Sequence, residues 1–526
     1  MSVSRRRFLG LSGAGSAAVL LGTGAWDAST TYAAPAGHGD PFTLGVGSGD
    51  PQWNSVVLWT RLATDPFAVD GKGGMPARPI RVEYEIARDP NFRYVVRRSS
   101  VVASPELGHS VHPEVRGLLP DHVYYYRFRT GREVSPTGRT RTTPHPFASP
   151  RELKFAFASC NAWQDGYYTA YEHLAAEDLD LVVHLGDYLY ESGVKTNKRG
   201  VETDPRFHGE TFDLARYRLQ YSLYKSEAPL QAAHRNFPWI QTIDDHEVEN
   251  NWAGDLSQQD TEPDQDPAVF RARRAMAFQA MYENMPLRHD QMPSGPSVRL
   301  HRRLPYGRLA DITMLDTRQY RSDQPCGDGN SSTCTDRFDP DNTMLGGKQR
   351  AWLLDGFKRS NARWQILGNQ APMGQTDWLP GPETQVWLDP WDGYVAERNQ
   401  VLGAAQDSGV RNLVVITGDR HQNYALELKR DYENPASATV GTEFVGTSIT
   451  SGGDGADMSE QGQQFLAANP HLKFFNSQRG YVRVTVDQRQ WRSDYRVVPY
   501  VTTPGAPIST RASYVVEDRN PHVHAS

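Results

Sequence analysis

The sequence predicts a mixed α/β protein that is preceded by an all-β domain. Residues 40–145 contain short β-rich segments separated by turn residues, at the spacing of a β-sandwich. A Pro-rich link, RTTPHPFASPRE, follows. Beyond it, residues 151–526 contain short apolar runs that end abruptly in polar clusters, which is typical of buried strands in an α/β fold. A chain of 526 residues is long enough for both domains.

Residues 1–33 are expected to be a signal peptide rather than part of the fold. The stretch SRRRFLG holds the pair Arg5-Arg6 and precedes a small-residue apolar run, with a plausible cleavage point after Ala33. A membrane anchor is the alternative, but the run is rich in glycine and short for a span. We therefore expect export by the twin-arginine (Tat) machinery, a secreted (extracellular) protein, and no transmembrane segment in the mature chain.

The all-β domain is predicted from four segments, SVVLWTRL, IRVEYEIA, YVVRRSSVVA and VYYYRFRT. The piece GLLPDHVYYYRF carries Leu118, Pro120 and Tyr124. This arrangement resembles the tyrosine-corner strand of a fibronectin-III-like sandwich.

Five apolar runs in the second domain are expected to be buried strands: 153–161, 179–187, 237–247, 363–370 and 412–421. Helical stretches lie between them, among them 267–285 and 347–360. Ligands of α/β sheets bind outside the carboxyl ends of the strands. The polar residues that end the five runs should therefore meet in one place.

These strand ends offer side chains that bind metals. They carry Cys160 and Asn161, then Asp187 and Tyr190, then Asp244, Asp245, His246 and Glu247, then Asn369, and finally Asp419 and His421. Thiolate, phenolate and imidazole favour a transition metal, whereas Asp and Asn oxygens favour a hard cation. One site with both sets indicates two different metals that share a carboxylate. Such a pair can activate water and stabilise charge on a phosphoryl group.

The order Cys160, GDYLY, DDHE, GNQ, GDRH resembles the metallophosphoesterase (purple-acid-phosphatase-like) superfamily, and within it the PhoD-type alkaline phosphatases and phosphodiesterases. The resemblance covers nearly the whole chain. It implies a metallophosphoesterase-type β-sandwich flanked by helices, with an N-terminal fibronectin-III-like domain.

The resemblance also implies roles for single residues. Asp187 takes the position of the carboxylate that bridges two metals, and Tyr190 matches the tyrosine that binds ferric iron, Fe(3+). Cys160 stands where most of the superfamily has an aspartate, so it is expected to bind the iron, and His421 to complete that site. His246 is expected to be catalytic together with Asp187, by protonating the leaving group or holding charge.

The second metal site departs from the superfamily in one direction. Asp245, Asn369 and Asp419 replace an asparagine and two histidines, which leaves oxygen ligands only. Such a site disfavours zinc and favours calcium, Ca(2+). Asp244 is either a ligand of an additional calcium ion or a hydrogen-bonding group, and the number of calcium ions stays open.

The predicted function is a secreted, metal-dependent hydrolase of phosphomonoesters and phosphodiesters that uses a metal-bound hydroxide or oxide as nucleophile. The alternative is a phospholipase D-type phosphodiesterase on the same scaffold, since the loops 194–212, 255–268 and 374–396 decide the substrate. A carbohydrate-binding or cell-wall-binding protein with a lapsed catalytic domain is a third hypothesis, which the intact set of five motifs disfavours. The oligomeric state is not predicted.

Other residues receive simpler interpretations. The net charge of -6 predicts no basic surface for nucleic acid. Cys326 and Cys334 are expected to form a disulfide in an oxidising compartment. His184 is interpreted as a core histidine and Tyr188 as a packing residue. Arg420 is expected to face away from the metals. His234, His301, His522 and His524 lack a motif and are expected at the surface.

Overall fold

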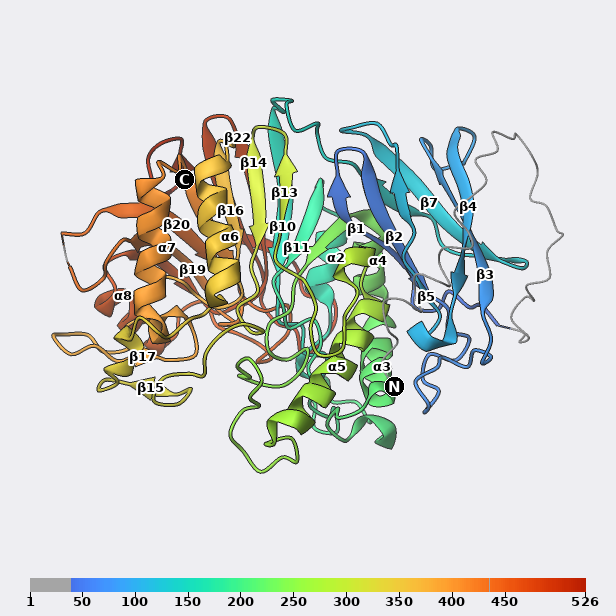
Figure 1. The fold of residues 1–526 in the computed structure, drawn as a ribbon, viewed down its shortest axis with the longest axis horizontal. Coiled ribbons are helices and arrows are strands. Elements are labelled where there is room, and N and C mark those ends of the chain that lie inside the picture. The colour runs from blue at the N-terminus through green and yellow to red at the C-terminus, as the bar shows by residue number, and fades with distance from the viewer. Residues whose placement is uncertain (1–38, 435) are drawn as a thin grey trace.

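The computed structural model describes residues 39–434 and 436–526 and is a mixed α/β fold rich in sheet (Figure 1). The predicted signal peptide, residues 1–33, lies outside the described residues. In the described part of the chain the helices are α2 (Thr169–Ala175), α3 (Leu214–Lys225), α4 (Ala228–Asn236), α5 (Pro267–Asn284), α6 (Gly346–Arg359), α7 (Val395–Asp407) and α8 (Glu460–Ala468).

The largest sheet has the strand order β25-β24-β23-β22-β10-β11-β12-β1-β2-β5, and β6 also pairs with β2. Its strands are β1 (Val46–Gln52), β2 (Ser55–Arg61), β5 (Ser110–Val111), β6 (Glu114–Arg116), β10 (Glu152–Ala158), β11 (Leu181–His184), β12 (Pro238–Gln241), β22 (Arg479–Asp487), β23 (Gln490–Val498), β24 (Ser509–Glu517) and β25 (Val523–Ala525). Strands β10, β11 and β12 are parallel, and β1 runs parallel to β12. The sheet therefore includes strands from both sides of the Pro-rich link.

The second sheet has the order β13-β14-β16-β18-β20-β19-β21. Its strands are β13 (Arg302–Tyr306), β14 (Ala310–Met314), β16 (Trp364–Gly368), β18 (Leu413–Thr417), β19 (Asn423–Lys429), β20 (Thr439–Val445) and β21 (Leu472–Asn476). Strands β14, β16, β18 and β20 are parallel. All five apolar runs predicted as buried strands are thus strands, divided between two sheets.

The two sheets pack face to face and helices cover their outer faces (Figure 1). Side chains of β10 and β11, such as Phe155 and Val183, share one apolar core with Ile366 of β16 and Ile416 of β18. A second core joins the first sheet to α2–α5, and a third joins the second sheet to α6–α8. The carboxyl ends of parallel strands from both sheets can therefore lie close together at one edge.

A separate five-stranded sheet lies at the right-hand end of Figure 1. Its strands are β3 (Ile80–Ala87), β4 (Val95–Ala103), β7 (Val123–Thr130), β8 (Glu133–Val134) and β9 (Gly138–Arg141). All four predicted β-segments of the N-terminal part are strands, three in this sheet and one as β2. The Tyr124 hydroxyl accepts a hydrogen bond from the Leu119 amide at 2.9 Å, which is the bond of a tyrosine corner.

Cys326 and Cys334 form the predicted disulfide, with their Cα atoms 6.0 Å apart. The bridge closes a loop beside the small pair of strands β15 (Asn330–Ser331) and β17 (Val386–Trp387). Cys160 is buried and is the free cysteine of the described residues.

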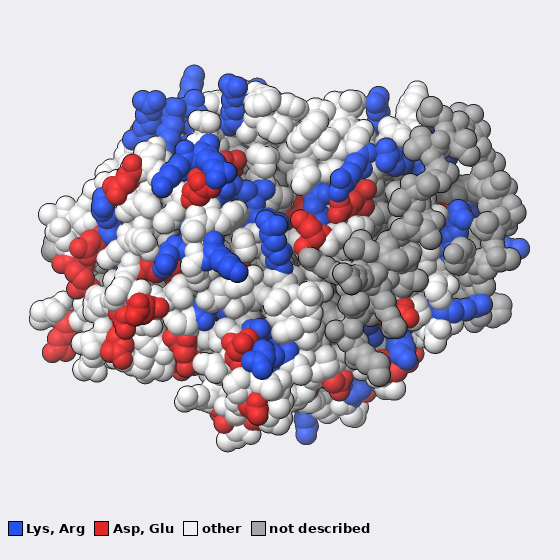
Figure 2. All heavy atoms as spheres, viewed as in Figure 1, with Lys and Arg blue, Asp and Glu red and all other residues white. Residues whose placement is uncertain are grey.

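Basic and acidic side chains share the face shown in Figure 2, with basic residues denser along its upper left and acidic residues along its lower left. Among the described residues, no helix is long and apolar enough to cross a membrane.

Candidate metal centre

The loops that follow β10 and β11 are bound to each other by their backbones. The Cys160 amide donates to the Gly186 carbonyl at 3.2 Å, and the Asn161 amide donates to the Asp187 carbonyl at 3.0 Å. The Cys160 carbonyl in turn accepts from the Ser451 amide at 3.3 Å, beyond β20 of the other sheet. These bonds hold the ends of both sheets at one place.

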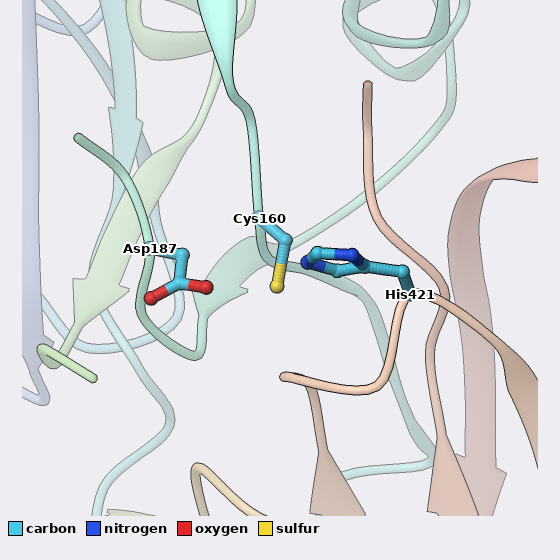
Figure 3. A group of neighbouring side chains, drawn as sticks. All are labelled: Cys160, Asp187 and His421. Atoms are coloured by element: carbon cyan, nitrogen blue, oxygen red, sulfur yellow. The ribbon is translucent and has the colours of Figure 1, made fainter. Parts of the chain in front are cut away.

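Cys160, Asp187 and His421 meet at this place although they come from three separate strand ends (Figure 3). One ligand atom from each lies within 4.8 Å of the others. Figure 3 shows the sulfur of Cys160 between the carboxylate of Asp187 and the imidazole of His421. The three side chains offer a thiolate, a carboxylate and an imidazole to one position.

Tyr190 joins this group through its hydroxyl. The hydroxyl donates to Asp187 Oδ2 at 3.0 Å and lies 3.2 Å from His421 Nε2. A phenolic oxygen within reach of two ligand atoms completes a donor set that suits a transition metal.

Asp187 also belongs to a second group, with Asp245 and His246, whose ligand atoms again lie within 4.8 Å of one another. The two groups share only Asp187. A shared carboxylate between two such groups is the arrangement expected of a residue that bridges two metals.

Several buried oxygens at this place have no hydrogen-bond partner among the described residues. They are Asp187 Oδ1, Asp244 Oδ2, Asp245 Oδ1 and Asp419 Oδ2. A buried carboxylate oxygen without a partner is costly, and a bound cation removes that cost. The donor set and these unpaired oxygens fit the two metals that the sequence predicts.

The electrostatics of the protein without cations point the same way. Burial and the nearby Asp187 raise the pKa of the Cys160 thiol and of the Tyr190 phenol. Burial and Asp245 raise the pKa of Asp187, and burial and Asp244 raise that of Asp419. Cations reverse this tendency because they stabilise the deprotonated ligands. The site therefore holds too many acidic groups for all of them to be ionised unless positive charge is added.

His246 is fixed at the edge of the centre by two contacts. Its Nδ1 lies 2.8 Å from Glu191 Oε2, and its ring stacks on Tyr190 with centroids 4.1 Å apart. Burial opposes protonation, but Glu191 and Asp245 outweigh it and raise the pKa of His246. The imidazole is therefore oriented by Glu191 and keeps Nε2 for other partners.

Asn369 and Asp419 contribute differently from the other predicted ligands. Asn369 Oδ1 accepts a hydrogen bond from Trp391 Nε1 at 3.2 Å, and its amide nitrogen donates to the Ala371 carbonyl, so its side chain is already oriented. Asp419 lies outside the two close groups. Its carboxylate is nevertheless near enough to Cys160 to raise the pKa of the thiol.

Arg318 and Asp389 are part of the centre, but they were not identified from the sequence. Arg318 Nε donates to Asp244 Oδ1 at 2.6 Å, and its Nη1 donates to Asp389 Oδ1 at 3.0 Å. Burial by itself raises the pKa of Asp245, but the positive charges of Arg318 and His246 outweigh burial and lower this pKa. Arg318 follows β14, where the sequence LADITMLDTR is another apolar run that ends in polar residues. That run could have revealed it.

The ligands sit on an unusual backbone. Cys160, Asp187, Asp419 and His421 all have positive φ, between 54° and 66°. Non-glycine residues rarely adopt this conformation, and it concentrates at functional sites. The sharp turns follow the ends of the strands and bring these side chains together at one edge of the sheets.

Gly186 allows the loops to pack this closely. Its φ is +115°, and a Cβ atom built on it would lie 2.5 Å from the backbone nitrogen of Asp244. No larger residue fits between the loops that carry Asp187 and Asp245.

The simpler interpretations have mixed outcomes. His184 is a buried histidine whose Nε2 lies 2.9 Å from Asn161 Oδ1, as predicted. Tyr188 packs in the core, but its hydroxyl lies 2.8 Å from His234 Nε2. The prediction that His234 lies at the surface is therefore wrong, because α4 turns this residue inward against Trp239.

Arg420 stacks on Trp387, with its guanidinium carbon 4.4 Å from the ring centroid. Trp378 packs against Phe465 and Trp391 is fully buried. The aromatic loop 374–396 is thus largely packed against the domain.

Comparisons with known proteins agree with this geometry. The family model described as PhoD-like phosphatase matches residues 155–495, and the model for the N-terminal domain of PhoD-like phosphatases matches residues 27–144. Alkaline phosphatase D of Bacillus subtilis (strain 168) is 48% identical over 489 residues, which cover 92% of this chain and 82% of the relative. A solved structure described as the structure of PhoD superposes with a TM-score of 0.89 at 46% identity, covering 94% of this chain and 93% of that one. The chain therefore belongs to the PhoD-like phosphatase family.

Proposed function

We propose that this phosphoesterase hydrolyses phosphomonoesters and phosphodiesters at a mixed-metal centre built on Asp187. One observation carries the proposal: Asp187 is shared by one group with Cys160, Tyr190 and His421 and by a second group with Asp245 and His246. The family membership supports phosphate esters as the substrate class.

The donor sets suggest which residues hold each ion. Cys160, Tyr190, His421 and Asp187 would hold ferric iron, and Asp187, Asp245, Asn369 and Asp419 would hold calcium. Bound cations of this kind lower the pKa of water and withdraw charge from phosphoryl oxygens. Asp244 is held by Arg318 through one oxygen, which leaves its other oxygen for a further cation.

His246 acts on the leaving group in this proposal. Because Nδ1 is bound to Glu191, the imidazole can present a proton at Nε2 to the oxygen that departs from phosphorus. The stack on Tyr190 holds the imidazole ring in place.

Arg318 balances the charge of the second position. It is fully buried and contacts Asp244 and Asp389, with Asp245 at 3.8 Å. A fixed guanidinium favours the ionised form of its neighbours: the pKa values of Asp245 and Asp389 are lowered although burial opposes this, whereas burial outweighs Arg318 at Asp244 and raises its pKa to about 7. We assign it a positioning role toward these ligands.

The same centre would serve a phospholipase D-type enzyme, so the second candidate differs only in its substrate. The aromatic loop 374–396 bears on this choice. Since Trp391 is buried and Trp378 packs on Phe465, this loop offers little apolar surface to a lipid. We favour soluble esters for that reason.

The N-terminal part and the cellular location complete the proposal. The tyrosine-corner bond of Tyr124 supports a fibronectin-III-like sandwich for residues 40–145. The Arg5-Arg6 motif supports export by the Tat machinery and an extracellular enzyme.

The test measures metals and rates on the purified protein. We expect iron and calcium in it, and hydrolysis of p-nitrophenyl phosphate and bis(p-nitrophenyl) phosphate faster than that of phosphatidylcholine vesicles. Tyr190→Phe should abolish absorption in the visible range, whereas the control Tyr188→Phe should keep it. Full activity after exhaustive removal of both metals would contradict the proposal.

A further inference from the structure

A second group of carboxylates lies beside the metal centre. Its members, called the acidic cluster below, are Glu191, Glu210, Glu249, Asp260, Glu262 and Asp264. Two sets of ligand atoms in it lie within 4.8 Å of one another, one from Glu191, Glu210 and Glu249, the other from Glu249, Asp260 and Glu262. Glu249 belongs to both sets, so the cluster is continuous.

Arg273 of α5 is the cation at the middle of the acidic cluster. Its Nη2 donates to Glu210 at 2.6 Å, and its Nη1 donates to Asp264 Oδ2 at 2.8 Å and also contacts Glu249. Its Nε is occupied by the Thr211 carbonyl at 3.1 Å. One guanidinium therefore contacts four of the six carboxylates, and its single charge cannot neutralise the cluster.

Asp264 is a buried acid of the cluster with one carboxylate oxygen that lacks a partner. The residue is 1% exposed, and its Oδ1 has no hydrogen-bond partner among the described residues. Its Oδ2 binds Arg273 Nη1, and the same nitrogen contacts Glu249 and Glu262. Asp264, with its unpaired Oδ1, is therefore part of the acidic cluster. A buried carboxylate oxygen without a partner is expensive unless a cation or a donor meets it.

We propose that the acidic cluster binds a calcium ion that is separate from the metals of the Asp187 centre. Carboxylate oxygens from three chain segments (191, 210 and 249–264) match the high, flexible coordination of calcium better than the strict octahedron of magnesium.

The position of the acidic cluster gives this calcium a structural role. Glu191 binds His246 through Oε2 and accepts from the Asn250 amide through Oε1 at 3.2 Å. A cation that joins Glu191 to Glu249 would tie the loop after β12 to the loop after β11, which are the two loops that frame His246.

The test counts calcium ions per chain. The double variant Glu210→Gln with Glu262→Gln leaves the Asp187 centre and Glu191 unchanged, and Glu383→Gln, an exposed acid, is the matched control. After equilibrium dialysis in calcium, plasma mass spectrometry should find one calcium ion fewer per chain in the double variant than in the control, with equal iron. Calcium should also raise the thermal unfolding midpoint of the control more than that of the double variant.

An Asp187→Asn variant separates this site from the proposed active site. It should lose iron and hydrolysis yet retain one calcium ion, which Glu210→Gln with Glu262→Gln then removes. Equal calcium content in the double variant and the control would overturn the inference, as would an Asp187→Asn protein that binds no calcium. If the double variant does not fold, Glu262→Gln alone should weaken calcium binding at this site at least tenfold, and unchanged affinity would refute the site.

Discussion

Replacing Gly186 by alanine should disable the metal centre by separating two of its loops. The new Cβ would lie 2.5 Å from the backbone nitrogen of Asp244, where ordinary contacts begin near 3.4 Å, so the loops must move apart by about 0.9 Å. Alanine at a φ of +115° also costs about 1–3 kcal/mol of backbone strain. A misplacement of ~1 Å in an active site can lower a rate about 100-fold.

The assay compares kcat/KM on p-nitrophenyl phosphate with the iron content of the folded protein. Gly505→Ala is the control, because Gly505 also has positive φ, +82°, but a Cβ at that position would have nothing within 4 Å of it. We expect about a 100-fold loss of kcat/KM and reduced iron in Gly186→Ala, and neither in Gly505→Ala. Wild-type kcat/KM and iron content in Gly186→Ala would refute the reasoning, as would an equal loss in the control.

Three further predictions follow from single features. Cys160→Ser should lower iron content and activity together, since a hydroxyl replaces the thiolate. Plasma mass spectrometry measures the iron and kinetics measures the activity, and full iron occupancy in the variant would contradict the prediction. Lys225 is buried and burial lowers its pKa, so Lys225→Met should stabilise the protein. Between the lowered pKa of the folded protein and pH 10, Lys225 binds a proton in the unfolded state but not in the folded state. The stability gained by Lys225→Met therefore grows by about 1.4 kcal/mol per pH unit as the pH falls through this range. Urea unfolding at pH 7 and pH 9 measures this gain, and a gain that is equal at both pH values would contradict the prediction. Serine at both Cys326 and Cys334 should cost about 2.5 kcal/mol of unfolding free energy with iron unchanged, and an unchanged urea midpoint would count against it.

The ligands of the metal centre could be predicted because each follows an apolar run. Asp187 and His421 are recognisable from the sequence since a buried parallel strand must deliver its next residues to the carboxyl edge of its sheet. Their chemistry, thiolate and phenolate on one side and oxygen on the other, is a property of the side chains alone. The tyrosine corner at Tyr124 was readable for the same reason, because its partner lies only five residues away.

Arg318 and Asp389 could not be assigned in this way. They are 71 residues apart in the chain and become partners only where β14 and the aromatic loop reach the same edge. Whether a charged residue ends up buried among carboxylates depends on which segments pack around it, and no local pattern encodes that. His234 was misjudged for the same reason, since its burial depends on how α4 packs against the first sheet.

By itself, the sequence determined the strands, the chemistry of the ligands and the order in which they arrive. Only the tertiary structure decided that β1 pairs with β12, so that the N-terminal part joins the catalytic sheet. It also decided that two groups of ligands share Asp187, and that four acids gather around Arg273. The physical reason is that hydrophobic periodicity and side-chain chemistry are local, whereas burial, pairing and charge balance arise between segments that are distant in the chain.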